Sequence, residues 1–291
     1  MLSNEQLSEI ESACQDAGGY IPAPIVAIIL ASGIPLEQLM LDLIPMAKTF
    51  AIPSISNFYV GAVSHGLSGS LYFGANYEFP GLALTCSVHG EQAATVNAIA
   101  HGETGIDLLA VSAAPCGYCR QFLNELTTAA TLQVILPNTP ITLLTTLLPN
   151  AFGPVDLGIT AALMSPQSHG MTLPDPIDDV ANAALHAANT SYAPYSLSYA
   201  GVALKTSDGS IYTGSVAENA AFNPSMSPLE AAVVTLTING GKKYGDIVDA
   251  VLVEAAASKA SQISATRDVL ATMTKVSLRI YEAMALRTDR S

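Results

Sequence analysis

The stretch CSVHGEQAATVNAIAHGETGIDLLAVSAAPCGYCRQFLNEL, residues 86–126, decides the fold class of this chain. The spacing of its apolar residues predicts a buried helix over 89–102, and the apolar run that follows predicts a buried strand over 107–114. A second helix is predicted to begin at residue 117. Helix, strand and helix in direct succession are typical of a layered α/β domain, in which helices cover a sheet.

The flanking segments extend this pattern. Residues 57–66 and 69–79 are rich in Tyr, Val and Phe and are joined by a short turn, so they predict a β-hairpin. Residues 132–137 predict a further strand, and residues 140–149 one more element. This part of the chain is therefore expected to read strand, strand, helix, strand, helix, strand.

The first 48 residues are expected to be helical. Ser3 is a candidate N-cap with a Gln three residues later, and Gly18 with Gly19 should end this first helix. A second helix is predicted over residues 35–50, after a proline turn.

Composition limits the classes of function. At 291 residues, half of them apolar, the chain can form two domains with separate cores. Its net charge of -13 disfavours binding to a nucleic-acid polymer and favours a small substrate. The chain contains no run of about 18 apolar residues, so no membrane-spanning helix is predicted. The start of the chain does not resemble a secretory signal, and four cysteines without a disulfide framework suit a reducing compartment, so we expect a cytoplasmic protein.

An internal repeat is visible in the sequence. Residues 56–79 and the stretch beginning at residue 196 carry Ser, Gly and Tyr in the same order, 140 positions apart. The second copy has Ser-Pro-Leu-Glu over 227–230 where the first has His-Gly-Glu over 89–91, and it has no cysteine. We therefore expect a duplicated domain whose second copy cannot bind a metal. The predicted parts are a helical segment (1–48), a catalytic domain (49–165), a linker (166–177) and a degenerate domain (178–291).

The pair Cys116 and Cys119 has three possible chemical roles. A strand before the pair and a helix after it suit a thioredoxin-like redox pair. A structural zinc site would need His89 and also Cys86 as a fourth ligand. Two thiolates and one imidazole alone would instead leave one position of zinc open for water, as in catalytic sites.

The catalytic alternative explains more of the sequence. Glu91 stands two residues from His89 and could carry the proton of a water on the metal. Two predicted helices have their N-termini at His89 and at the Cys pair, and the positive end of a helix dipole favours thiolates. Arg120 could balance the sulfur charge or could be an ordinary helix-surface residue.

The order His-x-Glu followed by Pro-Cys-x-x-Cys is the signature of zinc nucleobase deaminases. With NFYVGA, YFGANYEFP, PCGYCRQFLNEL, LPNAFGP and SGSVAENAAFNPSMSPLEAA, the chain resembles cytidine deaminase of the two-domain, homodimeric class over nearly its whole length. The resemblance implies a duplicated three-layer fold, with a mixed sheet between helices. It also implies one zinc per chain, bound by His89, Cys116 and Cys119, with Glu91 as the catalytic acid and base.

The implied reaction is hydrolytic deamination of cytidine and 2′-deoxycytidine to the uridines, with release of ammonia, by zinc-activated water in pyrimidine salvage. The residues that the resemblance assigns to the substrate are Phe58 against the pyrimidine, Asn76 and Glu78 at the ribose, the backbone of Gly90 and Ala114, and Phe152 from the partner chain. Gly90 is a departure, because the family usually has Ala or Val there. A deaminase of another nucleobase or nucleotide and an inactive zinc-stapled interaction domain remain alternatives.

Overall fold

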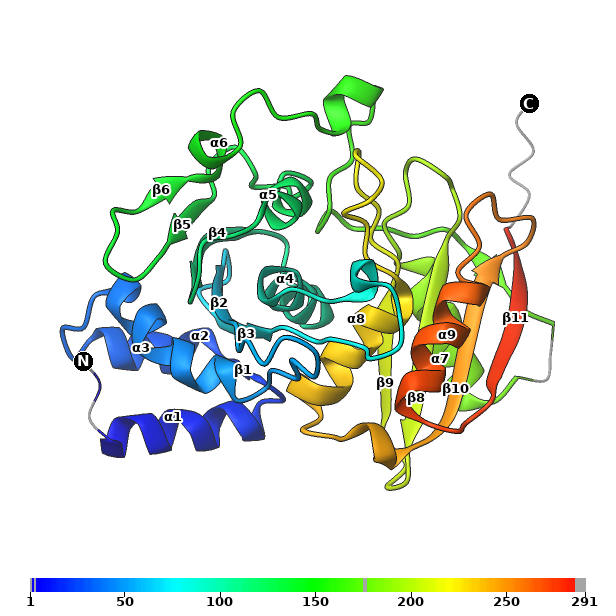
Figure 1. Cartoon of the computed structure of the whole chain (residues 1–291), viewed down its shortest axis with the longest axis horizontal. Coiled ribbons are helices and arrows are strands. Elements are labelled where there is room, and N and C mark those ends of the chain that lie inside the picture. Colours follow the sequence, from blue (N-terminus) through cyan, green and yellow to red (C-terminus); the bar gives the residue numbers. More distant parts are fainter. Residues whose placement is uncertain (1, 3, 175–176, 286–291) are drawn as a thin grey trace. The chain divides into compact units, whose positions relative to one another are not determined.

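The computed structural model describes residues 2, 4–174 and 177–285. Figure 1 shows the chain, which forms two compact units. The first unit holds Met1–Ser165 together with Asn219–Pro224 and Thr237–Gly241. The second unit holds Pro166–Glu218, Ser225–Leu236 and Lys242–Ser291.

The N-terminal segment contains three helices and one short strand. They are α1 (Asn4–Asp16), β1 (Tyr20–Ile21), α2 (Ala23–Leu30) and α3 (Leu36–Lys48). The predicted helices are confirmed, and the expected N-cap Ser3 lies outside the described residues. The expectation that the whole segment is helical is wrong at β1, which pairs antiparallel with β3 (Leu71–Ala75).

A mixed sheet forms the centre of the first unit, in the order β1-β3-β2-β4-β5-β6. Its other strands are β2 (Gly61–Gly66), β4 (Ile106–Val111), β5 (Gln133–Ile135) and β6 (Thr142–Leu143). β4 and β5 are parallel, and the remaining pairs are antiparallel. The helices after the hairpin are α4 (Gly90–Ala100), α5 (Gly117–Leu123) and α6 (Leu144–Leu147). The predicted hairpin, helices and strands are confirmed, although the hairpin begins at Gly61 rather than at residue 57.

Helices pack on both faces of this sheet, which gives three layers. A side chain at Gly74 would meet the α4 backbone, 2.2 Å from the Gly90 carbonyl oxygen. A side chain at Gly61 would meet the α3 backbone, 2.7 Å from the Ile44 carbonyl oxygen. Gly74 pairs with Ala62, so Gly61 faces the opposite side of the sheet.

The second unit repeats this architecture. Its sheet has the order β7-β11-β10-β8-β9, and its strands are β7 (Met171–Thr172), β8 (Ala200–Thr206), β9 (Ile211–Ser215), β10 (Ile247–Ala255) and β11 (Leu278–Ala285). The order β9-β8-β10-β11 matches β3-β2-β4-β5, with the last pair parallel in both sheets. The helices are α7 (Asp179–Asn189), α8 (Pro228–Val234) and α9 (Ile263–Met273). The predicted duplication is therefore present in the fold.

Among the described residues, no single helix is long and apolar enough to cross a membrane. The pair α2 and α3 reaches that length and composition together, with a bend of 117° between the two helices.

Candidate metal and active site

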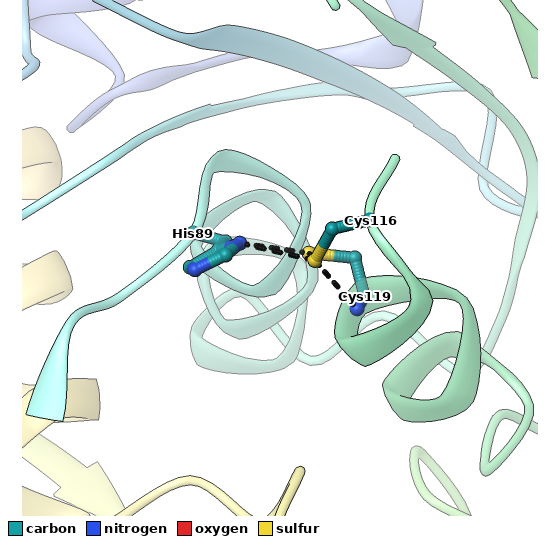
Figure 2. Close-up of side chains that lie close together, drawn as sticks. All are labelled: His89, Cys116 and Cys119. Carbon is teal, nitrogen blue, oxygen red and sulfur yellow. Dashed lines mark hydrogen bonds between the residues drawn. The ribbon is translucent and has the colours of Figure 1, made fainter. Parts of the chain in front are cut away.

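Three candidate metal ligands come together from two helix starts. His89 is the N-cap residue of α4, Cys116 is the N-cap residue of α5, and Cys119 lies in the first turn of α5. His89 Nδ1 is 3.5 Å from Cys116 Sγ and 3.2 Å from Cys119 Sγ, and the two sulfurs are 3.6 Å apart. Figure 2 shows the three side chains pointing toward one another from these elements.

These distances fit the edges of a tetrahedral zinc site. Bonds of about 2.3 Å to sulfur and about 2.0 Å to nitrogen place two thiolates about 3.8 Å apart, and a thiolate and an imidazole about 3.5 Å apart. Within residues 2, 4–174 and 177–285, no other group of three or more His, Cys, Asp or Glu side chains is close enough to hold a metal ion. Cys86 is not part of the group. Three protein ligands are typical of catalytic rather than structural zinc.

The environment of the two thiols favours one thiolate before any metal binds. The hydrogen bond between the two sulfur atoms lowers the pKa of Cys116 to about 5, helped by backbone N–H groups of α5 and by His89. The same hydrogen bond and burial raise the pKa of Cys119. A helix start that carries a thiolate beside an imidazole is a suitable cation site.

Glu91 is a buried carboxyl group beside the candidate ligands. It lies in the first turn of α4, is 4% exposed, and is within hydrogen-bonding reach of Cys119. Burial is the main cause that raises the pKa of Glu91 above its usual value. A carboxyl group whose pKa is raised toward neutrality can both give and accept a proton, as acid–base catalysis requires.

The structure gives a packing reason for glycine at position 90. A side-chain carbon at Gly90 would lie 3.0 Å from Val60 Cγ1 and 3.6 Å from Ala62 Cβ. The first distance is tighter than a normal contact, so an Ala at this position would require Val60 to move. The Val60 side chain thus occupies the space that the methyl group of an alanine at position 90 would need.

Phe58, Asn76 and Glu78, which are expected at the pyrimidine and ribose, are connected by hydrogen bonds to the exposed segment 55–59 and to Val60. Phe58 is 59% exposed, so it is not the buried strand residue that its surroundings alone would favour. The Asn76 amide accepts a hydrogen bond from the Val60 N–H at 2.9 Å and donates one to the Phe58 carbonyl at 2.9 Å. Glu78 accepts hydrogen bonds from the Ser56 backbone N–H at 2.8 Å and from the Ser56 hydroxyl at 2.5 Å. Asn76 and Glu78 follow β3 rather than lie within it.

The electrostatics of Glu78 follow from these bonds. Burial by itself would raise the pKa of Glu78, but the hydrogen bonds from Ser56 and Ile55, together with the charge of His89, lower it below its usual value. Glu78 is therefore ionised at neutral pH.

Arg120 and Ala114, which the sequence analysis also singled out, lie around the turn that precedes α5. Arg120 donates hydrogen bonds to the Pro115 carbonyl at 2.9 Å and to the Leu147 carbonyl at 2.8 Å, so it fastens the turn before Cys116 to α6. Ala114 is exposed next to this turn. Arg120 is therefore not an unattached helix-surface residue, because two backbone carbonyls hold its guanidinium group.

A segment from far along the chain, Asn219–Pro224, belongs to the first unit and fastens to α5. Asn219 donates to the Gln121 carbonyl at 2.9 Å, and Gln121 donates to the Asn219 side chain at 3.3 Å. The buried Glu125 carboxylate accepts from the Ala220 N–H at 3.0 Å. Local sequence patterns do not predict contacts between residues about 100 positions apart, so the sequence analysis missed this segment. The only feature that could have pointed to it is the presence of two polar residues, Gln121 and Glu125, soon after the Cys pair.

Phe152 lies in a loop beside the same helix. Its side chain is 46% exposed, and its carbonyl accepts hydrogen bonds from Gln121 at 2.8 Å and from Asn124 at 3.1 Å. The loop is thus held through its backbone, while nearly half of the aromatic side chain remains exposed.

A three-layer α/β unit that joins a His-Cys-Cys group to a buried glutamate defines a zinc-dependent hydrolytic deaminase. Two matches to the family model "Cytidine and deoxycytidylate deaminase zinc-binding region" cover residues 35–135 and 144–267. The chain is 45% identical over 265 residues to a cytidine deaminase of Aeromonas salmonicida, covering 91% of this chain and 89% of that protein. It is 44% identical over 272 residues to a cytidine deaminase of Photobacterium profundum, covering 92% of each chain.

A crystal structure of cytidine deaminase from Mycobacterium tuberculosis is 26% identical, with a TM-score of 0.38, and the match covers 41% of this chain and 99% of that chain. From its similarity to the two curated relatives, this chain belongs to the cytidine deaminase family. Zinc is its cofactor.

Proposed function

We propose that this chain hydrolyses cytidine and 2′-deoxycytidine to uridine and 2′-deoxyuridine, with release of ammonia, as a step of pyrimidine salvage. The observation that carries the proposal is the juxtaposition of His89, Cys116 and Cys119 with the buried carboxyl group of Glu91. A structural metal site has no need for a proton-transferring group, so the inactive-scaffold alternative leaves Glu91 unexplained.

His89, Cys116 and Cys119 would hold the zinc ion. When bound, zinc supplies Lewis-acid activation of the water that attacks the pyrimidine. The side chains arrange for this in advance, because Cys116 has a lowered pKa and all three ligand atoms lie within 4.8 Å of one another. Little reorganisation is then required on metal binding.

Glu91 would move the protons of the reaction. It takes a proton from the attacking water and delivers it to pyrimidine N3 as the new bond forms at C4. It then takes the second proton of that water from the new hydroxyl group on C4 and delivers it to the amino group, so that the C4–N bond breaks, ammonia leaves and the C4 carbonyl forms. Its burial excludes bulk water from these transfers and keeps its pKa raised between the two tasks.

The remaining residues would bind the nucleoside. Phe58 packs against the pyrimidine, the Asn76 amide donates to and the Glu78 carboxylate accepts from the ribose 3′-hydroxyl, and the Gly90 N–H faces the pyrimidine carbonyl. The Ala114 backbone accepts a hydrogen bond from the amino group. A carboxylate at the sugar repels a phosphate, which favours a nucleoside over a nucleotide.

The active protein would be a homodimer in which Phe152 of one chain covers the pyrimidine bound to the other. The exposure of the Phe152 side chain in a loop held by its backbone supports this proposal. The catalytic domain would span residues 49–165 and the degenerate domain 178–291, after a helical segment over 1–48 and a linker over 166–177. All four cysteines, each within the described part of the chain, are free of disulfides, which suits the cytoplasm.

The test is a substrate panel with purified, zinc-loaded protein. Cytidine, deoxycytidine, cytosine, adenosine and deoxycytidylate are each incubated, and the absorbance change and ammonia release are followed. Turnover of the two nucleosides alone supports the proposal. Preference for deoxycytidylate or for another base would replace the substrate class, and no turnover of any compound would favour the inactive zinc-stapled domain.

A further inference from the structure

A chain of hydrogen bonds connects Glu78 to the backbone of Phe58. Glu78 Oε2 accepts from the Ile55 and Ser56 N–H groups, both at 2.8 Å, and Glu78 Oε1 accepts from the Ser56 hydroxyl at 2.5 Å. Ser56 Oγ in turn accepts from the Phe58 N–H at 3.0 Å. The segment 55–59 is exposed throughout, so packing alone does not hold it.

The second unit contains the same chain of bonds. Glu218 Oε2 accepts from the Tyr195 N–H at 2.9 Å and the Ser196 N–H at 3.1 Å, and Glu218 Oε1 accepts from the Ser196 hydroxyl. Ser196 Oγ accepts from the Ser198 N–H at 3.0 Å. The two arrangements agree donor for donor and acceptor for acceptor.

Comparison of the two sets of hydrogen bonds distinguishes residues that serve the fold from residues that occur only at the candidate site. Since no metal-ligand group exists among the described residues of that unit, the Glu218 bonds serve the fold. The aromatic Phe58 is replaced there by Ser198, which is buried. Asn76 also lacks a counterpart, because Val216 stands at its position. The bonds between glutamate and serine are thus common to both units, whereas Phe58 and Asn76 occur only beside the metal ligands.

We infer that Glu78 is a positioning residue, which acts through Ser56 to hold Phe58 in place for the pyrimidine. This inference rests on the proposed function, because it requires that Phe58 contact the substrate base. A carboxylate offers about four acceptor positions. Three of those of Glu78 are occupied by the turn, so a sugar hydroxyl would find one remaining.

The first test is a double-mutant cycle between Ser56→Ala and Phe58→Ala, with kcat and KM measured for cytidine. Ser56→Ala should raise KM about tenfold with little change in kcat, as expected for loss of a hydrogen bond to a charged group. In the Phe58→Ala background the same change should have no further effect, because its consequence passes through Phe58. The matched control is Ser196→Ala in the second unit, which should leave KM unchanged.

A second arm separates positioning from direct contact with the sugar. The increase in KM caused by Ser56→Ala and by Glu78→Ala should persist with 2′,3′-dideoxycytidine, which lacks the 3′-hydroxyl. If the Glu78→Ala loss disappears with that substrate while Ser56→Ala is neutral, Glu78 acts on the sugar alone and the inference is overturned. Independent additivity of Ser56→Ala and Phe58→Ala would overturn it as well.

A third measurement does not depend on activity. Amide hydrogen exchange of residues 55–58 should accelerate about tenfold in zinc-loaded Ser56→Ala, while the same change at Ser196 should affect only its own turn. Unchanged exchange at 55–58 overturns the inference even in an active enzyme. If the wild-type protein fails to deaminate cytidine, the proposed function fails, and accelerated exchange still supports the role of Glu78 in holding the turn.

Discussion

The starts of α4 and α8 solve the same structural problem with different chemistry. In α4 the N-cap residue is His89, whose backbone N–H donates to the Gln92 side chain at 3.1 Å. In α8 the N-cap residue is Ser227, whose N–H donates to Glu230 at 2.9 Å. Both helices therefore begin with a side chain that reaches back to the cap, as helix starts require.

The difference lies in the residues that this shared frame presents. Leu229, two residues after the cap of α8, stands where Glu91 stands in α4, and it is fully buried. Both units keep a strand glycine where the helix backbone packs closely. A side chain at Gly214 would lie 2.3 Å from the Pro228 carbonyl oxygen of α8, as one at Gly74 would lie 2.2 Å from the Gly90 carbonyl oxygen of α4. A duplicated fold can thus lose its chemistry through a few substitutions while the contacts that hold the sheet and helices stay.

The largest effect should come from removing a proposed metal ligand. Cys119→Ala should abolish zinc binding and reduce activity by ~10⁶-fold or more, because the metal activates the attacking water. Metal analysis should find about one zinc in the wild type and none in the variant. Cys86→Ala is the control and should retain zinc and activity. Two zinc ions per chain, or an active zinc-free enzyme, would break the comparison between the two units.

Glu91→Ala tests the second difference between the helix starts. It should retain zinc but lower kcat by ~10⁴-fold, since general acid–base catalysis is typically worth about 10²- to 10⁴-fold and Glu91 is proposed to serve more than one proton transfer. Steady-state kinetics beside metal analysis would measure this. Glu230→Gln is the control from the second unit and should leave kcat unchanged. Near-normal turnover of Glu91→Ala would show that another group moves the protons.

The shared-site proposal predicts an effect of intermediate size. Phe152→Ala should lower kcat/KM by about tenfold to a hundredfold, because an aromatic contact to the pyrimidine is lost. Val155→Ala, on the same exposed loop, is the matched control and should be near wild type. The monomer is expected to be inactive even with zinc bound.

Complementation sharpens that test. Glu91→Ala and Phe152→Ala chains, dissociated and reassociated together, should recover about a quarter of wild-type activity. Half of the dimers would be mixed, and each would have one intact site of two. Full activity of Phe152→Ala alone, active monomers on dilution, or absence of recovery would each rule out a shared site.

The smallest effect concerns the glycine at position 90. Gly90→Ala should destabilise the protein by about 1–2 kcal/mol, because the new methyl group crowds Val60. Val60→Ala should relieve the crowding in the double variant, so that thermal unfolding shows a favourable coupling between the two changes. Additive destabilisation would mean that Val60 is not the reason for the glycine.

Local spacing was sufficient for much of this protein. The hairpin after residue 56 and the helices at His89 and Cys116 were predictable because helix periodicity and turn residues act over a few positions. The strand β1 was missed because two residues carry too little pattern, and only their pairing with β3 makes them a strand.

The sequence by itself determined the family and predicted the chemistry, since His89, Glu91, Cys116 and Cys119 follow the order His-x-Glu and Cys-x-x-Cys that is typical of zinc deaminases. Only the tertiary structure decided that Glu78 accepts a hydrogen bond from Ser56, 22 positions earlier, and that Glu125 accepts one from the Ala220 N–H, 95 positions later. A polar group that leaves water must find a partner wherever the folded backbone places one. That placement depends on the packing of the whole unit and not on neighbouring residues.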